Sequence, residues 1–259
     1  MSAPMTADHG SRIDVTLVAG GMYHDVDFAR LRLLELLSEH DDFRVRVQPD
    51  YEDADAIAAG SILVSYTCNV RPSEGAQRAI RDWVEGGGRW VALHGTNSAL
   101  DLGTPQGVDS PRVFPLWADT LGSQFIAHPP IAPYRVDLSD ADHWLVAGIE
   151  PFDTDDELYL CEHADRDALV PLLHTDWQGI AKGFVESDWA DGPERHLVMY
   201  LRELGSGAVL YNTLGHCRGH YDMAPVVDYY PVIERGSWEQ PAYFELLRRS
   251  LRWARGDTA

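Results

Sequence analysis

Residues 13–25 read IDVTLVAGGMYHD, a run of strand-forming residues that ends at two glycines and is soon followed by a histidine. Residues 89–94 (RWVALH) and 208–216 (AVLYNTLGH) repeat this order of a strand and then a histidine. Ligands of open α/β sheets bind beyond the carboxyl ends of the strands, where distant segments of the chain meet. The three stretches therefore predict a histidine-lined pocket at one edge of an α/β sheet.

The residues around these stretches predict strands joined by helices. Further strands are expected at 43–47 and 61–66, and helices after residue 25 and from Ser73 to the glycines at 86–88. Such alternation is typical of a parallel sheet with crossover connections. The second half of the chain instead holds short strand patterns and a final helix that starts at Pro241. The strands are expected at 134–138, 157–161, 169–173, 196–201 and 208–211.

The length of the chain favours one domain, because 259 residues suffice for one large α/β core and are short for two. We expect a disordered tail over residues 1–12, a single domain over 13–256 and a loop at 101–112. Residues 219–239 combine prolines, acidic residues and tyrosines without any period. This stretch is interpreted as a further loop or a lid.

The composition disfavours several kinds of partner. With 41 acidic against 21 basic residues, the formal net charge is -20. Nucleic acids and anionic membranes both need a basic protein surface, so neither is expected to bind. No apolar stretch approaches the roughly 20 residues that span a bilayer, and the N-terminus lacks an apolar signal core, which predicts a cytoplasmic protein. The scattered Cys68, Cys161 and Cys217 fit reduced thiols.

Four histidines are candidates for the pocket: His24, His94, His128 and His216. Imidazole titrates near neutrality and is a common metal ligand. Together with a carboxylate such as Glu157, these rings match a zinc or other transition-metal site that keeps one position open. Without a metal, the same groups would move protons to and from a carbonyl-bearing substrate. Both interpretations stay open at this point, as does a plain solvated position for Glu157.

Residues near these histidines are candidates for contacting a substrate. The turn at Gly20 and Gly21 either brings backbone N–H groups close to a ligand or serves only as a tight turn. Asp25 either orients an imidazole or caps the following helix. The rings of Tyr23 and Phe125 either stack on a sugar or pack in the core. Neither GxGxxG nor GxxxxGK[ST] occurs, so no nucleotide cofactor is expected.

Nucleophilic hydrolases have little support in the sequence. The GxSxG motif of serine hydrolases is absent. Cys68 follows a strand pattern, but no histidine partner is evident near it in the sequence. A cysteine-dependent amidase is therefore the least favoured enzyme class.

Five motifs together resemble the trehalose-utilisation ThuA-like family, in matching order along the chain. They are VAGGMYHD (18–25), GGGRWVALHGTNSA (86–99), LGSQFIAHPP (121–130), DDELY (155–159) and GSGAVLYNTLGH (205–216). The resemblance implies an α/β, flavodoxin-like fold of the class I glutamine amidotransferase-like type, with a mainly parallel sheet flanked by helices and a strand-rich C-terminal half. The positions that match the family are His24, Asp25, His94, His128, Glu157 and His216.

The resemblance also implies a role in disaccharide breakdown, beside dehydrogenases that oxidise sugars to 3-keto derivatives, and a divalent metal, with zinc as the first candidate. His94 falls where the glutaminase relatives carry their nucleophilic cysteine, so glutaminase activity is not expected. We therefore predict an enzyme of carbohydrate catabolism that acts on a keto-sugar or keto-glycoside. A lyase, an isomerase and a hydrolase all remain open.

In this prediction His94 and His216 lie nearest the chemistry, and Glu157 is a basic or orienting group. His24 and His128 join them as metal ligands or proton relays, and the contacts to the sugar derivative come from Gly21, Tyr23, Asp25 and Phe125. The alternative, from a different class, is a non-catalytic module that binds sugar or a protein partner on the same fold. A homo-oligomer is compatible with either function.

Overall fold

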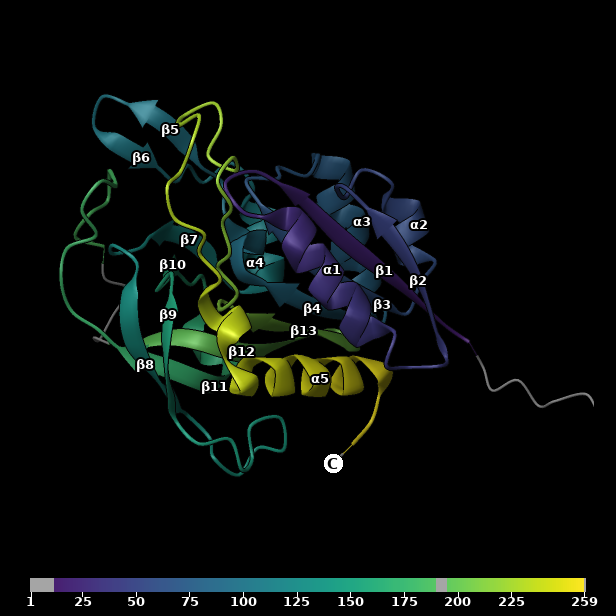
Figure 1. Ribbon diagram of the computed structural model, residues 1–259. Coiled ribbons are helices and arrows are strands. Elements are labelled where there is room, and N and C mark those ends of the chain that lie inside the picture. Colours follow the sequence, from purple (N-terminus) through teal and green to yellow (C-terminus); the bar gives the residue numbers. More distant parts are fainter. Residues whose placement is uncertain (1–11, 190–194, 259) are drawn as a thin grey trace, which may run out of the picture.

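The computed structural model describes residues 12–189 and 195–258. A nine-stranded mixed sheet runs through the centre of the molecule (Figure 1). In sheet order, its strands are β2 (Phe43–Gln48), β1 (Ile13–Gly21), β3 (Ile62–Cys68), β4 (Arg89–Leu93), β13 (Gly207–Asn212), β12 (Arg195–Leu204), β11 (Leu169–Asp176), β8 (Ala132–Leu138) and β9 (Phe152–Asp156).

Helices cover both faces of this sheet, as Figure 1 shows. α1 (Val26–Leu37) and α5 (Pro241–Arg255) share one apolar core with the strands, and α2 (Ala54–Ala58), α3 (Glu74–Glu85) and α4 (Pro115–Leu121) share another. Successive strand side chains point to opposite faces, so Leu17 lies in the first core and Val18 in the second. Among the helices of the described residues, none is both long and apolar enough to cross a membrane.

The sheet changes from parallel to antiparallel at β13. The strands β2, β1, β3, β4 and β13 pair in parallel, whereas β13, β12, β11, β8 and β9 pair antiparallel. The expected mainly parallel sheet is thus correct for the first half only. Parallel neighbours need a crossover of a dozen or more residues. In the antiparallel half only residues 205–206 separate β12 from β13, which is too few for a crossover.

Local sequence signals account for the elements that carry the candidate site. The Asp25 carboxylate accepts a hydrogen bond from the Phe28 backbone N–H at 3.1 Å and caps α1. Ser73 caps α3 in the same way, and the Gly86 position ends that helix. β4 has the bounds predicted from the sequence, and α5 begins at Pro241 as expected.

The structure differs from the sequence prediction in two connections. The loop expected at 101–112 contains a hairpin of β5 (Asp101–Thr104) and β6 (Gly107–Asp109). The strand expected at 157–161 starts only at Leu160, because residues 157–159 link β9, which ends at Asp156, to β10 (Leu160–Glu162). β10 pairs with β7 (Gln124–Ala127) in a separate sheet. The expected tail over residues 1–12 lies outside the described residues except for Arg12.

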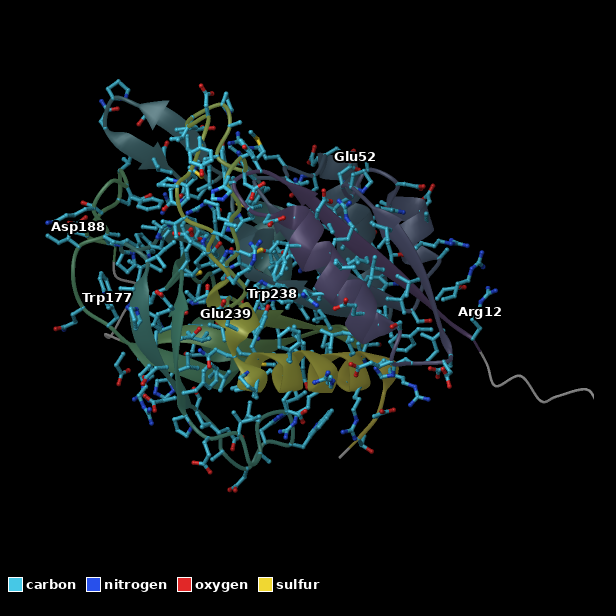
Figure 2. The ribbon with its side chains drawn as sticks, in the orientation of Figure 1. Arg12, Glu52, Trp177, Asp188, Trp238 and Glu239 are labelled. Atoms are coloured by element: carbon cyan, nitrogen blue, oxygen red, sulfur yellow. The ribbon has the colours of Figure 1, made fainter. Side chains whose placement is uncertain are left out.

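Residues 219–235 form an irregular loop whose two ends are joined. Backbone hydrogen bonds of 2.9 and 2.8 Å link Arg218 and Glu234 across its base. The chain then enters a short 3-10 helix, η3 (Gly236–Glu239), where Trp238 is buried at the start of α5 (Figure 2). Its Nε1–H donates to the Gly215 carbonyl at 2.8 Å. This hydrogen bond of Trp238 holds the end of the loop against the segment that follows β13.

Candidate metal centre

Three histidines from distant segments meet at the carboxyl edge of the parallel strands. His24 lies beyond the end of β1, His94 directly follows β4, and His216 lies beyond β13. The ring centroids are 4.6 Å apart for His24 and His94, 5.2 Å for His24 and His216, and 5.9 Å for His94 and His216. All three rings are buried. The convergence predicted from the three strand-then-histidine stretches is therefore what the structure contains.

Glu157 completes a group of four ligand-type side chains. It directly follows β9 and is buried. Its Oε2 atom lies 3.6 Å from His24 Nε2 and 3.5 Å from His94 Nε2, and its Oε1 atom lies 3.2 Å from His216 Nδ1. One ligand atom from each of His24, His94, Glu157 and His216 lies within 4.8 Å of all the others. Three histidines and one glutamate at this spacing match a transition-metal ion in size and in ligand type.

The backbone dictates which nitrogen each ring presents to this group. His94 Nδ1 lies 2.8 Å from the Thr213 carbonyl oxygen, and His24 Nδ1 lies 3.3 Å from the Met22 carbonyl oxygen. A carbonyl only accepts hydrogen bonds, so each Nδ1 carries a proton and each ring turns its Nε2 toward the cluster. Metal-binding histidines have this arrangement, with the outer N–H held by a carbonyl or carboxylate.

The two Nε2 atoms of His24 and His94 are only 2.8 Å apart. Two nitrogen lone pairs at this distance repel each other unless a proton or a metal ion lies between them. Burial lowers the pKa of His24 to about 3, more than the nearby Glu157 carboxylate can offset, so this ring is neutral near pH 7. The ligand set and the close approach of the two Nε2 atoms therefore fit a cation, either a proton or a metal ion, held at the cluster.

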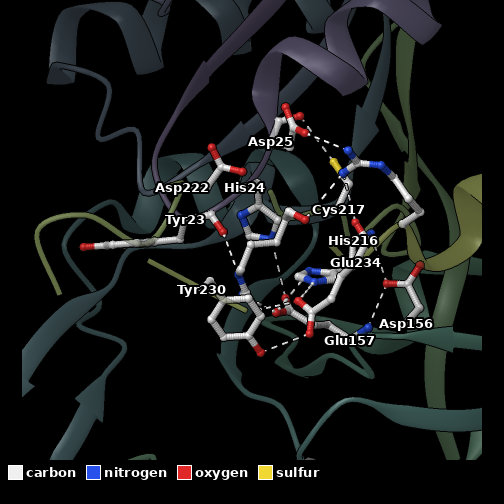
Figure 3. A network of polar contacts seen from close by, with 12 residues as sticks. Tyr23, His24, Asp25, Asp156, Glu157, His216, Cys217, Asp222, Tyr230 and Glu234 are labelled. Carbon is white, nitrogen blue, oxygen red and sulfur yellow. Dashed lines mark hydrogen bonds and ion pairs between the residues drawn. The ribbon is translucent and has the colours of Figure 1, made fainter. Parts of the chain in front are cut away.

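His216 is oriented by a carboxylate rather than by a carbonyl. Its Nε2 lies 2.8 Å from Glu234 Oε2, while its Nδ1 faces Glu157 (Figure 3). Burial opposes protonation of this ring, but Glu157 and Glu234 together outweigh it and raise the pKa of His216 to about 9. In the absence of a metal, His216 is thus an imidazolium held between two carboxylates.

Arg218 joins these two carboxylates. Its Nη2 donates to Glu157 Oε1 at 3.1 Å, and its Nη1 donates to Glu234 Oε2 at 2.7 Å. Burial by itself would raise the pKa of Glu157, but interactions with the surrounding histidines, His216 above all, outweigh it and hold that pKa well below its usual value. The pKa of Glu234 is also lowered, since His216 and Arg218 outweigh its partial burial. Both carboxylates are therefore charged at neutral pH.

Asp156 fixes the backbone around the cluster. Its buried carboxylate accepts hydrogen bonds from the backbone N–H groups of Glu157 (2.7 Å), Gly215 (3.0 Å), His216 (3.1 Å) and Ser237 (2.9 Å). It thus ties the end of β9 to the segments after β13 and before α5 (Figure 3). One side chain positions both Glu157 and His216.

Asp156, Arg218 and Glu234 were not identified from the sequence. Asp156 stands inside the DDELY motif, one residue before the carboxylate that was chosen, and Arg218 stands two residues after His216. Their closeness in the sequence to Glu157 and His216 could have identified both residues. Glu234 lies in the aperiodic stretch 219–239, where no local pattern distinguishes it from its acidic neighbours.

A cavity reaches the group of four at His24 and Glu157, and further residues predicted from the sequence line it. His128 lies on its wall, with Nδ1 2.7 Å from the Pro129 carbonyl oxygen and Nε2 3.7 Å from Glu157 Oε1. His128 therefore stands beside the group of four rather than in it. Tyr23 and Phe125 also line the cavity.

Gly21 and Asp25 do not line this cavity. Gly21 has φ +104°, and a Cβ atom there would lie 2.0 Å from the Cys68 carbonyl oxygen, so the position needs glycine for close packing of β1 on β3. The Asp25 carboxylate caps α1 and forms an ion pair with Arg235 at 3.1 Å. Both residues support the turn that carries His24 instead of facing the cavity.

The thiols offer no activated nucleophile at this site. Cys68, Cys161 and Cys217 are buried and form no disulfide, which agrees with reduced cysteines. Burial strongly raises the pKa of Cys68, and it raises the pKa of Cys217 to about 12. A cysteine nucleophile instead needs a lowered pKa.

The mixed sheet and its buried histidine cluster define an α/β protein with a candidate ligand or metal site at the carboxyl edge of parallel strands. A family model described as "ThuA: Trehalose utilisation" matches residues 14–230. The chain therefore belongs to the ThuA trehalose-utilisation family, which gives it a carbohydrate-related role. No curated protein matches the chain.

Solved structures share the fold at low sequence identity. A putative ThuA-like protein from Bacteroides uniformis has a TM-score of 0.66 at 15% identity, over 98% of this chain and 95% of that chain. One from Parabacteroides merdae has a TM-score of 0.60 at 16% identity, over 96% of this chain and 92% of that chain. A β-galactosidase from Rahnella sp. R3 matches 95% of this chain with 31% of its own length, at 12% identity and a TM-score of 0.55.

Proposed function

We propose that this protein is a metal-dependent enzyme of carbohydrate catabolism that acts on a keto-sugar or keto-glycoside. The observation that carries the proposal is the pair of facing Nε2 atoms of His24 and His94, 2.8 Å apart, with each ring fixed by a backbone carbonyl. His216 and Glu157 complete the ligand set. A divalent ion, with zinc as the first candidate, would be held by these four residues.

A bound divalent ion supplies Lewis-acid stabilisation of a carbonyl or enolate oxygen. The residues of the chain have separate tasks around it. Arg218 and Asp156 hold Glu157 and His216 in place, and Glu157 forms part of the cavity wall. The Tyr159 hydroxyl, 3.2 Å from His94 Nε2, lies at the same end and would contact a substrate oxygen.

His128 is the candidate proton acceptor. Its Nδ1–H is engaged by the Pro129 carbonyl, so its Nε2 lone pair faces the cavity. A keto group acidifies the neighbouring C–H, and loss of that proton to His128 leaves an enolate. Expulsion of a β-oxygen substituent from the enolate would complete an elimination, and return of the proton at another carbon would complete an isomerisation.

Metal analysis and turnover together test this function. Plasma mass spectrometry of the purified chain is expected to find about one divalent ion per molecule, and the protein should convert a 3-keto-glucoside. His94→Ala should lose most of the metal and the activity, whereas His40→Ala, which removes a ring stacked on Phe43 outside the site, should keep both. A wild-type protein that binds the sugar but holds no metal and converts nothing would instead be a binding module.

We also propose that the parallel half of the sheet is a flavodoxin-like, amidotransferase-type core without glutaminase activity. His94 has φ +46° directly after β4, the strained strand-to-turn position in which such folds present a reactive side chain. An imidazole stands there in place of a thiol, and the raised pKa values of Cys68 and Cys217 oppose a substitute nucleophile. We also propose a cytoplasmic location, which the buried Cys68, Cys161 and Cys217 support because they form no disulfide.

A further inference from the structure

We infer that the substrate carries an apolar group, such as an aromatic ring or a short alkyl chain, where a disaccharide would carry its second sugar. The inference rests on the proposed function, because it concerns the same cavity and the same keto-glycoside. It adds the chemical class of the leaving group. The carbohydrate role by itself does not specify this class.

The cavity has a polar end and an apolar end. His24, Glu157, Tyr159 and Arg218 lie at the polar end, beside the candidate metal centre. The remaining wall consists mostly of aliphatic and aromatic side chains that come from separate segments of the chain. They are Leu100, Leu102, Val108, Phe125, Phe184 and Met223.

The apolar end is built from packed side chains. The ring of Phe125 lies 4.5 Å from that of Tyr159 and 5.8 Å from that of Phe184, measured between centroids. A β-bridge between Val108 and Phe184 joins the β5–β6 hairpin to the segment that carries Phe184. Met223 contributes from the loop at 219–235. These contacts bring four distant segments around one apolar recess.

A second sugar is poorly matched to this recess. His128, packed on Phe184 with ring centroids 4.9 Å apart, and Ser98 are polar groups of the remaining wall. Most hydroxyls of a second sugar would nevertheless leave water for alkyl and aromatic groups that cannot form hydrogen bonds in return. The guanidinium of Arg218 cannot turn to serve them, because it already donates to Glu157, Glu234 and the Tyr23 carbonyl. An apolar substituent loses no hydrogen bonds there and removes apolar surface from water.

An anionic substituent is disfavoured for a separate reason. The chain has a formal net charge of -20, and Arg218, the guanidinium that lines the cavity, is already paired with two carboxylates. A phosphate or carboxylate on the leaving group would meet this charge without a free cation from Arg218. The favoured substrate is therefore a neutral keto-glycoside with an apolar aglycone.

A series of 3-keto-α-glucosides tests the inference with the full, metal-loaded protein. The compounds share the oxidised sugar and differ in the substituent, which is phenyl, methyl or a second glucose as in trehalose. We expect kcat/KM for the phenyl compound to exceed that of each of the others by about tenfold, a difference that burial of part of a ring accounts for. A higher value for the disaccharide than for the phenyl compound overturns the inference and leaves the proposed function intact.

Variants of the wall locate the effect. Phe184→Ala should reduce the preference for phenyl over methyl to about twofold, and this ratio, measured within one variant, is the readout. Val185→Ala is the matched control, because Val185 is the exposed neighbour of Phe184 and does not line the cavity. Val108→Thr, which keeps the volume and adds a hydroxyl, should also lower the preference if Phe184→Ala does not fold. An unchanged preference in the folded variants contradicts the inference.

Failure of the proposed reaction can be told apart from failure of this inference. If the protein converts none of the three compounds, the proposed function fails. The unoxidised phenyl and methyl α-glucosides, which need no chemistry, are then compared by calorimetry. Tighter binding of the phenyl glucoside by about tenfold still supports an apolar recess for the aglycone, and equal binding overturns it.

Discussion

Glu234 touches the outer nitrogen of a candidate metal ligand although it lies far from it in the sequence. Its Oε2 accepts from His216 Nε2 and from Arg218 Nη1, and its Oε1 accepts from the Tyr230 hydroxyl at 3.1 Å (Figure 3). A carboxylate in this position increases the basicity of the ring and fixes its tautomer. The residue therefore acts on the site through His216 and is a positioning residue.

Glu234→Gln should weaken metal binding by about 10- to 100-fold, because the neutral amide stabilises the His216 ring less than the carboxylate does. Chelator competition measures the dissociation constant. Tyr230→Phe, which removes only the hydrogen bond to the other carboxylate oxygen, is expected to change it by less than about threefold. Equal metal affinity in Glu234→Gln and wild type would remove Glu234 from the site.

Metal binding should also release a proton from His216. Its pKa of about 9 means that the ring is protonated in the metal-free protein below that pH, and a metal ion at Nδ1 must displace this proton. The apparent metal affinity should therefore rise about tenfold per pH unit between pH 6.5 and 8.5 and level off above 9. His24, with a pKa of about 3, contributes no proton in this range.

Calorimetry in buffers of different ionisation enthalpy checks this prediction, because it counts the protons released on binding. Titrations at pH 6.5 and 8.5 then give the change in affinity. A metal affinity that does not depend on pH would mean that His216 is not a ligand.

At the scale of elements, β9 decides where Glu157 points. The strand ends at Asp156, and its last side chain anchors the backbone after β13 and before α5, so that Glu157 enters the cluster from the antiparallel half of the sheet. His24, His94 and His216 approach from the parallel half. The site therefore forms only where the two halves of the sheet meet.

Asp156→Ala should destabilise the fold by about 4 kcal/mol, because it leaves several buried backbone N–H groups without an acceptor. Asp155→Ala is the matched control, since it removes an exposed carboxylate from the adjacent position of the same strand. Urea unfolding gives both free energies. A loss below about 1 kcal/mol in Asp156→Ala would contradict the anchoring role.

Secondary structure was predictable where local signals were strong. Asp25 and Ser73 are caps with a hydrophobic repeat after them, and Arg89–Leu93 is a run of strand-forming residues after three glycines, so these elements were correctly expected. The β5–β6 hairpin was not expected, because its strands are polar and rich in glycine. Its position depends on the contact between Val108 and Phe184, which no local pattern encodes.

At the scale of the whole molecule, the four candidate ligands connect segments that are far apart in the sequence. Such a metal would bind the folded chain and not the unfolded one, so binding energy becomes folding stability. At a free metal concentration of 100 times Kd, the gain is about 2.7 kcal/mol, which for a chain of this size raises Tm by about 5–10 °C.

Differential scanning calorimetry with and without a chelator measures this shift. His94→Ala should melt at the same temperature in both conditions, whereas His40→Ala should keep the shift of the wild type. A wild-type Tm that does not respond to metal or chelator would count against a metal ion at this cluster.

The sequence by itself determined the α/β class, the main caps and strands, the family resemblance and the histidines that meet, because these depend on local patterns and on the rule that parallel strands end at one edge. Only the tertiary structure decided how far the antiparallel half extends and where His128 lies beside the cluster. It also decided that Asp156 anchors the backbone and that Arg218 pairs with Glu234. Each of these depends on which distant segments pack together, and the physical reason is that burial and ion pairing across the sheet leave no periodic trace along the chain.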